Sequence, residues 1–294
     1  MSVIKYKYFF LGVSTVLTIA ALAAMVGFGY RQGIDFAGGT LWQVKFSGSG
    51  ASAESLKSLL AENGVSDAVV RETGNADEYS IRAKELSEEI HISLSGKIQE
   101  EFGAFEEMSF ASIGPAIGTE LRNRALLAFF LVLAGISLYV SYAFRKVSYP
   151  VNSWKYGIVT LITLFHDALI PAGAFAWWGW KYGVELDTNF IVAILVVMGF
   201  SVHDTIVVFD RIRENLLHSK NKDDLSGIID ASVKQTFARS INTSLTLFLV
   251  LVAMYVFGAH SLSYFTLMIL IGTVVGTYSS IFVASPMLTF FHRK

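Results

Sequence analysis

Long apolar runs dominate the pattern of hydrophobic and polar residues along the chain. A helix that crosses a membrane needs about 20 largely apolar residues. Runs of this kind begin at residue 8 and recur to residue 291, so that the pattern predicts six transmembrane helices at about 1–29, 125–144, 156–178, 189–209, 240–258 and 263–291. The first run follows Lys5 and Lys7, as the core of a signal peptide would, but it is too long for one. We therefore expect an uncleaved first helix.

Residues 30–120 lack such a run and alternate between the periods of strands and helices. Strand-like alternation covers 40–46, 65–71, 79–82 and 105–113, and apolar residues at helical spacing cover 56–63 and 86–102. The order β-α-β-β-α-β predicts a ferredoxin-like domain, a fold that hosts many functions and identifies none. The expected architecture is an α-helical polytopic membrane protein, with one α+β ferredoxin-like extracytoplasmic domain between helices 1 and 2.

Composition agrees with a membrane location. Of the 294 residues, 53% are hydrophobic and 16% are charged, whereas soluble proteins carry roughly a quarter charged residues. Residues 29–124 hold nine Lys and Arg against fifteen Asp and Glu, so that the soluble domain is acidic and the remainder is basic. This distribution argues against nucleic-acid binding. The absence of cysteine excludes disulfides, thiolate nucleophiles and cysteine metal sites.

The distribution of Lys and Arg near the ends of the apolar runs predicts the orientation. With the N-terminus in the cytoplasm, the short outer loops hold only Lys181. The cytoplasmic segments then hold Lys5, Lys7, Arg145, Lys146, Lys155, Arg211, Arg213, Lys220, Lys222, Lys234, Arg239, Arg293 and Lys294. The rule that cytoplasmic loops are positive therefore places both termini inside and residues 30–120 outside. Apolar residues on one face of 224–238 predict an amphipathic helix on the cytoplasmic surface.

Several polar residues interrupt the predicted membrane helices. Ionisable side chains there cost several kcal/mol and usually face a partner or water. The residues are His166 and Asp167 in the third helix, Ser201, His203 and Asp204 in the fourth, and Arg239, Asn242 and Thr243 at the start of the fifth. In the sixth helix, Gly272 and Gly276 predict a face for close helix contact.

Asp204 and Arg239 are predicted to lie at similar depth, because the fourth and fifth helices run antiparallel. A carboxylate near a guanidinium can alternate between a paired and a protonated state, and separating the pair changes its affinity for a proton. The alternative is a static hydrogen bond for Asp204, or contact with lipid headgroups for Arg239. His166 and Asp167 fit a structural contact and a role in proton movement equally well. His203 fits a relay role or contact with headgroups.

Three stretches together resemble the SecF proteins of the SecD/SecF family. The first is an Asp-Phe-x-Gly-Gly motif after the first helix, formed by Asp35, Phe36, Gly38 and Gly39. The second, residues 199–215, is similar to the family's signature in the fourth helix. The third, residues 239–244, is similar to the motif that opens the fifth helix. One departure is His203, where the family usually has Asn.

The resemblance implies membership of the resistance–nodulation–division superfamily and assistance to polypeptide export driven by the proton motive force. The residues then expected to couple protons are Asp204, Arg239, Thr243 and Asn242. A structural motif at the outer end of the first helix is expected to consist of Asp35, Gly38 and Gly39. The implied partners are SecD, the SecYEG channel, YajC, YidC, the unfolded polypeptide, protons and lipid, in a bacterial plasma membrane. We expect no enzymatic activity, cofactor or metal.

Three other functions are alternatives for this sequence. A small-molecule or lipid exporter of the same superfamily usually has two six-helix halves and larger outer domains in one chain. An intramembrane hydrolase using His166 and Asp167 would need a nucleophile motif or three metal ligands, and the sequence offers neither. A passive scaffold that stabilises the channel without moving protons is not excluded by the sequence.

Overall fold

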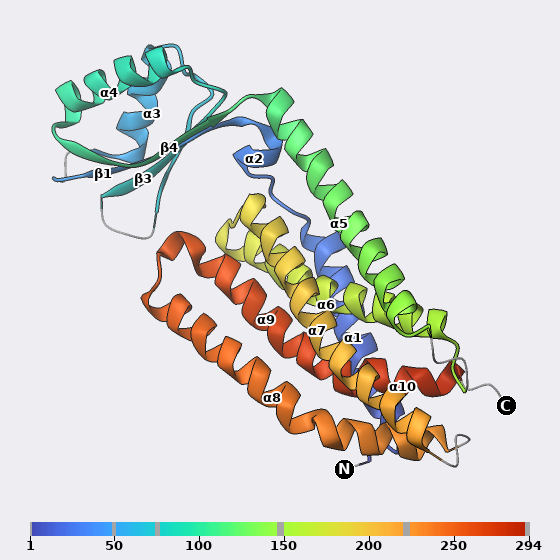
Figure 1. Cartoon of the computed structure of the whole chain (residues 1–294). Coiled ribbons are helices and arrows are strands. Elements are labelled where there is room, and N and C mark those ends of the chain that lie inside the picture. Colours follow the sequence, from blue (N-terminus) through green and yellow to red (C-terminus); the bar gives the residue numbers. More distant parts are fainter. Residues whose placement is uncertain (1, 49–50, 74–76, 146–149, 220–223, 292–294) are drawn as a thin grey trace. The chain divides into compact units, whose positions relative to one another are not determined.

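The protein is described from a computed structural model, in which the described residues are 2–48, 51–73, 77–145, 150–219 and 224–291. The chain forms two compact units. Residues 32–126 make up one, and residues 1–31 together with 127–294 make up the other. Figure 1 shows a small sheet with helices in the first unit and a bundle of long helices in the second.

The first unit is a four-stranded antiparallel sheet with two helices. Its elements are β1 (Gly39–Phe46), α3 (Ala53–Glu62), β2 (Val69–Glu72), β3 (Glu78–Ala83), α4 (Glu88–Phe102) and β4 (Phe105–Ile113). The strand order is β2-β3-β1-β4, and every neighbouring pair is antiparallel. This order confirms the predicted ferredoxin-like fold.

The core of this unit lies between the sheet and its helices. Alternate residues of β1, namely Trp42, Val44 and Phe46, are buried as the period of a strand requires. The indole of Trp42 donates a hydrogen bond of 3.0 Å to Glu107, and a ring nitrogen of His91 lies 2.7 Å from the same carboxylate oxygen. One half-exposed carboxylate therefore satisfies two buried polar groups.

The Asp-Phe-x-Gly-Gly motif forms a tight bend between the short helix α2 (Ile34–Ala37) and β1. Gly38 and Gly39 have φ angles of +76° and +113°, which favour glycine. A Cβ atom on Gly38 would lie 2.7 Å from Cα of Pro115, and one on Gly39 would lie 2.8 Å from the carbonyl oxygen of Ala83. The motif thus requires glycine for both conformation and space. Asp35 is half-buried in the first turn of α2.

Six long apolar helices of the described residues can cross a membrane, as predicted. They are α1 (Lys7–Phe28), α5 (Pro115–Ala143), α6 (Ser153–Tyr182), α7 (Thr188–His218), α8 (Leu225–Phe257) and a composite sixth. The sixth consists of α9 (Ser263–Ser279), the π-helical turn η2 (Ser280–Ala284), α10 (Ser285–Met287) and the 3₁₀ turn η3 (Leu288–Phe291). A 3₁₀ turn, η1 (His260–Leu262), precedes it, close to where the sequence predicted a break.

Two helices extend beyond their apolar runs. α5 begins at Pro115, before the predicted start at about 125, and the boundary between the units falls inside it. The predicted amphipathic helix at 224–238 is the first part of α8, because the chain between Ile228 and Phe257 contains no glycine or proline to interrupt it. Asp224 caps α8 by accepting a hydrogen bond from the backbone N–H of Gly227.

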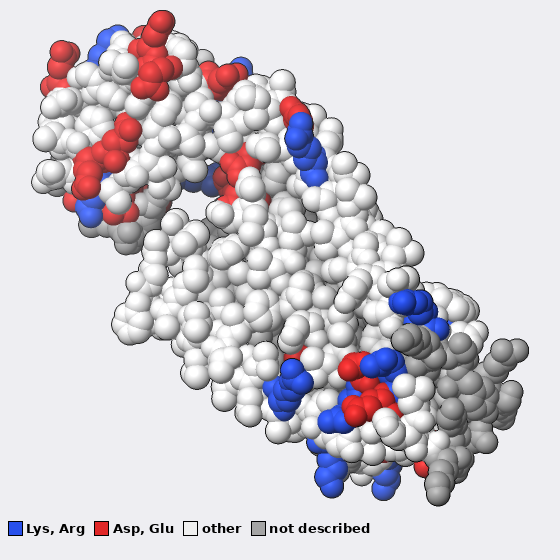
Figure 2. Space-filling model, in the orientation of Figure 1, with Lys and Arg blue, Asp and Glu red and all other residues white. Residues whose placement is uncertain are grey.

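Three helices form the centre of the bundle. In α6, α7 and the sixth helix, 61%, 50% and 56% of the most apolar segment is buried, against 11% in each of α1, α5 and α8. The long helices show almost no charged side chains along their middle on the face drawn in Figure 2, and Lys and Arg gather toward one end. At that end Lys7 donates a hydrogen bond to Thr289, and Lys155 donates one to the carbonyl of Phe291.

Glycines bring the central helices close together. A Cβ atom on Gly272 would overlap Val197 of α7, and one on Gly276 would lie 3.0 Å from Cβ of Ser201. Gly173 of α6 packs in the same way against the backbone of Ala21 in α1. The predicted small-residue face of 272–276 therefore presses α9 against α7, which fixes the position of the polar residues described next.

Candidate functional site

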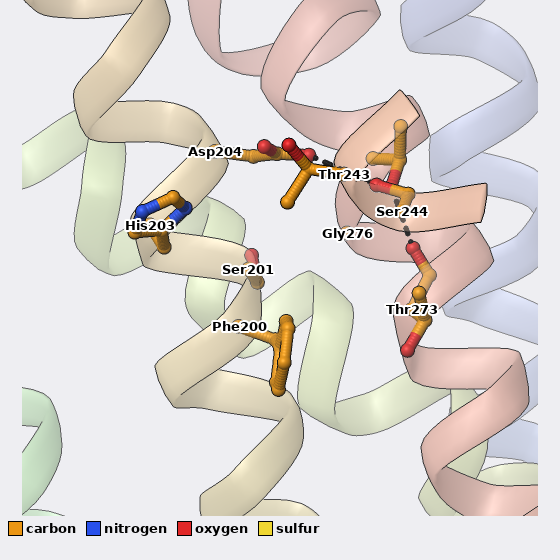
Figure 3. Close-up of a pocket in the computed structure, with 9 residues that line it drawn as sticks. Phe200, Ser201, His203, Asp204, Thr243, Ser244, Thr273 and Gly276 are labelled. Atoms are coloured by element: carbon orange, nitrogen blue, oxygen red, sulfur yellow. Dashed lines mark hydrogen bonds between the residues drawn. The ribbon is translucent and has the colours of Figure 1, made fainter. Parts of the chain in front are cut away.

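A small polar cavity surrounds Asp204 between α7, α8 and α9. Its volume is about 10 Å³, which is room for roughly one water molecule. Hydroxyl groups and one carboxyl group line it, as Figure 3 shows. The lining residues are Phe200, Ser201, His203, Asp204, Thr243, Ser244, Thr273, Gly276 and Thr277.

Asp204 is 6% exposed and points from α7 toward α8. Its carboxylate accepts a hydrogen bond of 3.3 Å from Ser244, whose hydroxyl also bonds to that of Thr277 on α9. A buried carboxylate without a cation is costly, so these surroundings disfavour a permanent charge on Asp204. The neighbouring hydroxyls nevertheless give the carboxyl group polar partners. The site can therefore hold a proton or a water molecule next to the acid.

Arg239 lies on the same helix as Ser244, five residues earlier, and its side chain is exposed. Among the described residues, the ion pairs within 4.0 Å do not include one between Asp204 and Arg239. Thr243 lines the cavity, whereas Asn242 is exposed and is not among the lining residues. Of the four residues expected to couple protons, the structure thus places Asp204 and Thr243 together in the cavity lining, which includes neither Arg239 nor Asn242.

His203 lines the cavity as well, but it is exposed. Its imidazole therefore lies between the cavity and the surface of the bundle. Asp210, Arg211 and Arg213, further along α7, pair within their own helix: Arg213 bonds to Asp210 and Arg211 to Glu214.

A second polar cluster lies between α6, α7 and the sixth helix. Asp167 is 0% exposed, and a ring nitrogen of His166 lies 2.7 Å from its Oδ1 atom. Ser201 donates a hydrogen bond to the Oδ2 atom, and Ser279 donates another of 2.6 Å. Ser201 belongs to both sites, because it also lines the cavity around Asp204.

Sequence reasoning missed four hydroxyl groups of these sites, those of Ser244, Thr273, Thr277 and Ser279. One signal was present, since Thr273 and Thr277 recur at the spacing of one helical face in an otherwise apolar run. Hydroxyl side chains of this kind often bond to their own helix, as Thr273 and Thr277 do, so the pattern alone does not reveal the cavity.

Comparison with known proteins gives a consistent result. The sequence profile of the family described as "Protein export membrane protein SecD/SecF, C-terminal" matches residues 94–294. The chain is 41% identical over 305 aligned residues to the protein translocase subunit SecF of Thermobaculum terrenum, with 100% of this chain and 95% of that protein covered. It is 35% identical to the SecF subunit of Anaerolinea thermophila, with 98% and 93% covered.

Two solved structures are also similar. The crystal structure of SecDF, a translocon-associated membrane protein from Thermus thermophilus, superposes with a TM-score of 0.81 at 31% identity. A structure of SecDF in the super-membrane-facing form gives a TM-score of 0.67 at 30% identity. Each covers 99% of this chain, but this chain covers only 38% of each of those chains.

Proposed function

The chain belongs to the SecD/SecF family of protein-export membrane proteins, as a SecF-type translocase subunit, and from this premise we propose that it couples proton entry to polypeptide export. The observation that carries the proposal is the placement of Asp204. Its carboxyl group is buried within a bundle of membrane-crossing helices, beside a cavity large enough for a water molecule and next to hydroxyl donors. A carboxyl group in that position can bind and release a proton.

We assign Arg239 the role of a charge that pairs with Asp204 in one state of the cycle. The described arrangement, in which Ser244 contacts the carboxyl group and Arg239 is exposed, fits the state in which the pair is separated. Protonation of Asp204 would favour this state, because a neutral acid needs no guanidinium partner. Thr243 and Asn242 lie between Arg239 and Ser244 on α8. This is the segment that would have to rotate or shift to bring Arg239 to Asp204.

The partners follow from the relatives. The solved SecDF chains contain the counterpart of this chain within a longer polypeptide, which supports a SecD-type protein as partner here. The weakly buried helices α1, α5 and α8 offer surfaces for such a partner. SecYEG, YajC, YidC and the translocating polypeptide are the further partners we propose, at a bacterial plasma membrane.

The proposed topology places both termini in the cytoplasm and residues 30–120 outside. The excess of Lys and Arg in the segments that would be cytoplasmic supports it. In this proposal the subunit catalyses no chemical reaction. It changes conformation as the proton binds and leaves. A small-molecule exporter is not favoured, since the SecF relatives match over nearly the whole chain.

The test is export of a secretory reporter into vesicles that hold the complete translocase, with and without a proton gradient. Asp204→Asn is expected to abolish the gradient-dependent part of export while the subunit still inserts and assembles. Asp210→Asn is the matched control, because Asp210 lies on the same helix but pairs with Arg213 at the surface. Equal export by wild type and Asp204→Asn would instead support a passive scaffold.

A further inference from the structure

The cluster around Asp167 contains an acid with no fixed positive partner. Both carboxylate oxygens accept hydrogen bonds, from His166 on one side and from Ser201 and Ser279 on the other. No lysine or arginine is among these partners. An isolated buried charge costs several kcal/mol, so the pair of Asp167 and His166 is least costly when together they hold a proton that makes them neutral.

The surroundings supply no other cation. Within the segments that pack against α6, residues 8–28, 127–143 and 263–291 contain no Asp, Glu, His, Lys or Arg. Residues 188–209 of α7 contain only His203 and Asp204. The ionisable side chains that can influence Asp167 from the interior are therefore its neighbour His166 and the two residues of the first cavity.

Two features of the cluster are compatible with proton exchange. The Nε2 atom of His166 is buried and has no hydrogen-bond partner among the described residues. Pro171 has no N–H, so the carbonyl oxygen of Asp167 receives no hydrogen bond from it within the helix. Buried polar atoms without partners are rare in native proteins and call for an explanation. An exchangeable proton or water at this end of the cluster provides one.

Ser201 connects this cluster with the cavity of Asp204. Its hydroxyl bonds to Asp167, and the same residue lines the cavity. The sixth helix holds the connection from the other side. Ser279 bonds to Asp167, and the next residue, Ser280, opens the π-helical turn and bonds at 2.8 Å to Thr205 of α7. Turns of this type occur frequently at functional sites.

We propose that Asp167 and His166 form a second proton-binding station, which exchanges protons with the Asp204 cavity through Ser201. In each transfer the Ser201 oxygen accepts a proton from the cavity side, its own hydroxyl proton passes to Asp167, and rotation of the hydroxyl restores the donor. One proton enters and one leaves, so the serine is unchanged. The inference rests on the proposed function of Asp204 and extends it to a second acid.

Infrared difference spectroscopy tests the station directly, because a protonated carboxyl group has its own C=O stretch. The full chain in its complex with the SecD-type subunit, in liposomes, is titrated with acid. Wild type is expected to show two titrating carboxyl signals from the bundle. Asp204→Asn removes one, and Asp167→Asn removes the other. Thr163→Val is the control in the same helix, since the Thr163 hydroxyl is buried but bonds to its own backbone.

Ser201→Ala separates a relay from a structural contact, because it keeps both acids and removes the hydroxyl between them. After a rapid pH jump we expect both signals to remain, with the Asp167 signal responding more slowly by about tenfold or more. An unchanged spectrum in Asp167→Asn, or an unchanged response rate in Ser201→Ala, overturns the second station while leaving the role of Asp204 intact. If Asp167→Asn does not assemble, the serine variant decides. Failure of Asp204→Asn to affect export would overturn the proposed function instead.

Discussion

Asp204 of α7 accepts a hydrogen bond of 3.3 Å from Ser244 of α8, whereas Arg239, five residues before Ser244 on α8, is exposed. A serine hydroxyl can bond to a carboxyl group in either protonation state, but a guanidinium favours the carboxylate alone. The contact with Ser244 therefore leaves Asp204 able to change its charge without losing its neighbour.

Ser244→Ala removes this neighbour and tests its importance. A hydrogen bond of this kind contributes about 0.5–1.5 kcal/mol, so we expect gradient-driven export to fall by up to about tenfold. The measurement is reporter export at a fixed proton gradient. Thr246→Ala is the control, because the Thr246 hydroxyl is exposed and bonds to the carbonyl of Thr243 in its own helix. Equal export by the two variants would contradict the assignment.

Arg239→Met tests the proposed paired state. We expect gradient-dependent export to fall by more than about tenfold, since a buried carboxylate that loses its cation is strongly destabilised. Arg239→Lys should retain part of the activity. Lys234→Met removes an exposed charge from the same helix and should export like wild type. If Arg239 serves only to contact lipid headgroups, Arg239→Lys will match wild type and Arg239→Met will show only a small defect.

Gly173→Ala probes the contact between α6 and α1. The new Cβ atom would lie 2.5 Å from Cα of Ala21, so the helices must move apart, at a cost of about 1–3 kcal/mol. Thermal unfolding in bicelles measures the loss. Gly135→Ala is the opposite case, since no atom lies within 4 Å of its Cβ position and alanine favours a helix by up to about 1 kcal/mol. A loss of stability in both variants would point to a general intolerance of larger residues.

Glu107→Ala tests the polar contact within the ferredoxin-like unit. It leaves the Trp42 indole, which is 0% exposed, and the His91 ring without their shared acceptor, and we expect a loss of about 1–3 kcal/mol. The rate of hydrogen exchange at the β1 amides of the intact chain measures this loss of stability. Glu106→Ala removes the neighbouring exposed carboxylate and should leave the exchange rates unchanged.

The sequence was sufficient for the membrane helices and for the order of strands and helices along the soluble unit. Both depend on local periodicity, which the apolar runs and the alternation around Trp42 and Val44 express directly. It did not reveal that α5 begins at Pro115, because its first ten residues are polar enough to hide the helix from a hydropathy pattern.

The candidate site was predicted where ionisable residues or the family resemblance mark it. Asp204, His166 and Asp167 stand out in apolar helices, and the resemblance indicated Thr243, but nothing in the sequence singled out Ser244 or Ser279. The expected proximity of Asp204 and Arg239 came from depth alone. Depth does not determine which way a side chain points around its helix. That direction depends on how the helices pack together, as α9 and α7 do at Gly272 and Gly276.

The π-helical turn from Ser280 to Ala284 makes the length of the last helix as important as its composition. Such a turn accommodates one residue more than a regular turn, and one residue corresponds to about 100° of rotation. Deleting a single residue here would let the helix close regularly and would swing Thr289 and Phe291 away from Lys7 and Lys155. Insertions and deletions in this stretch should therefore be far more harmful than substitutions, because they change the angular phase of everything that follows.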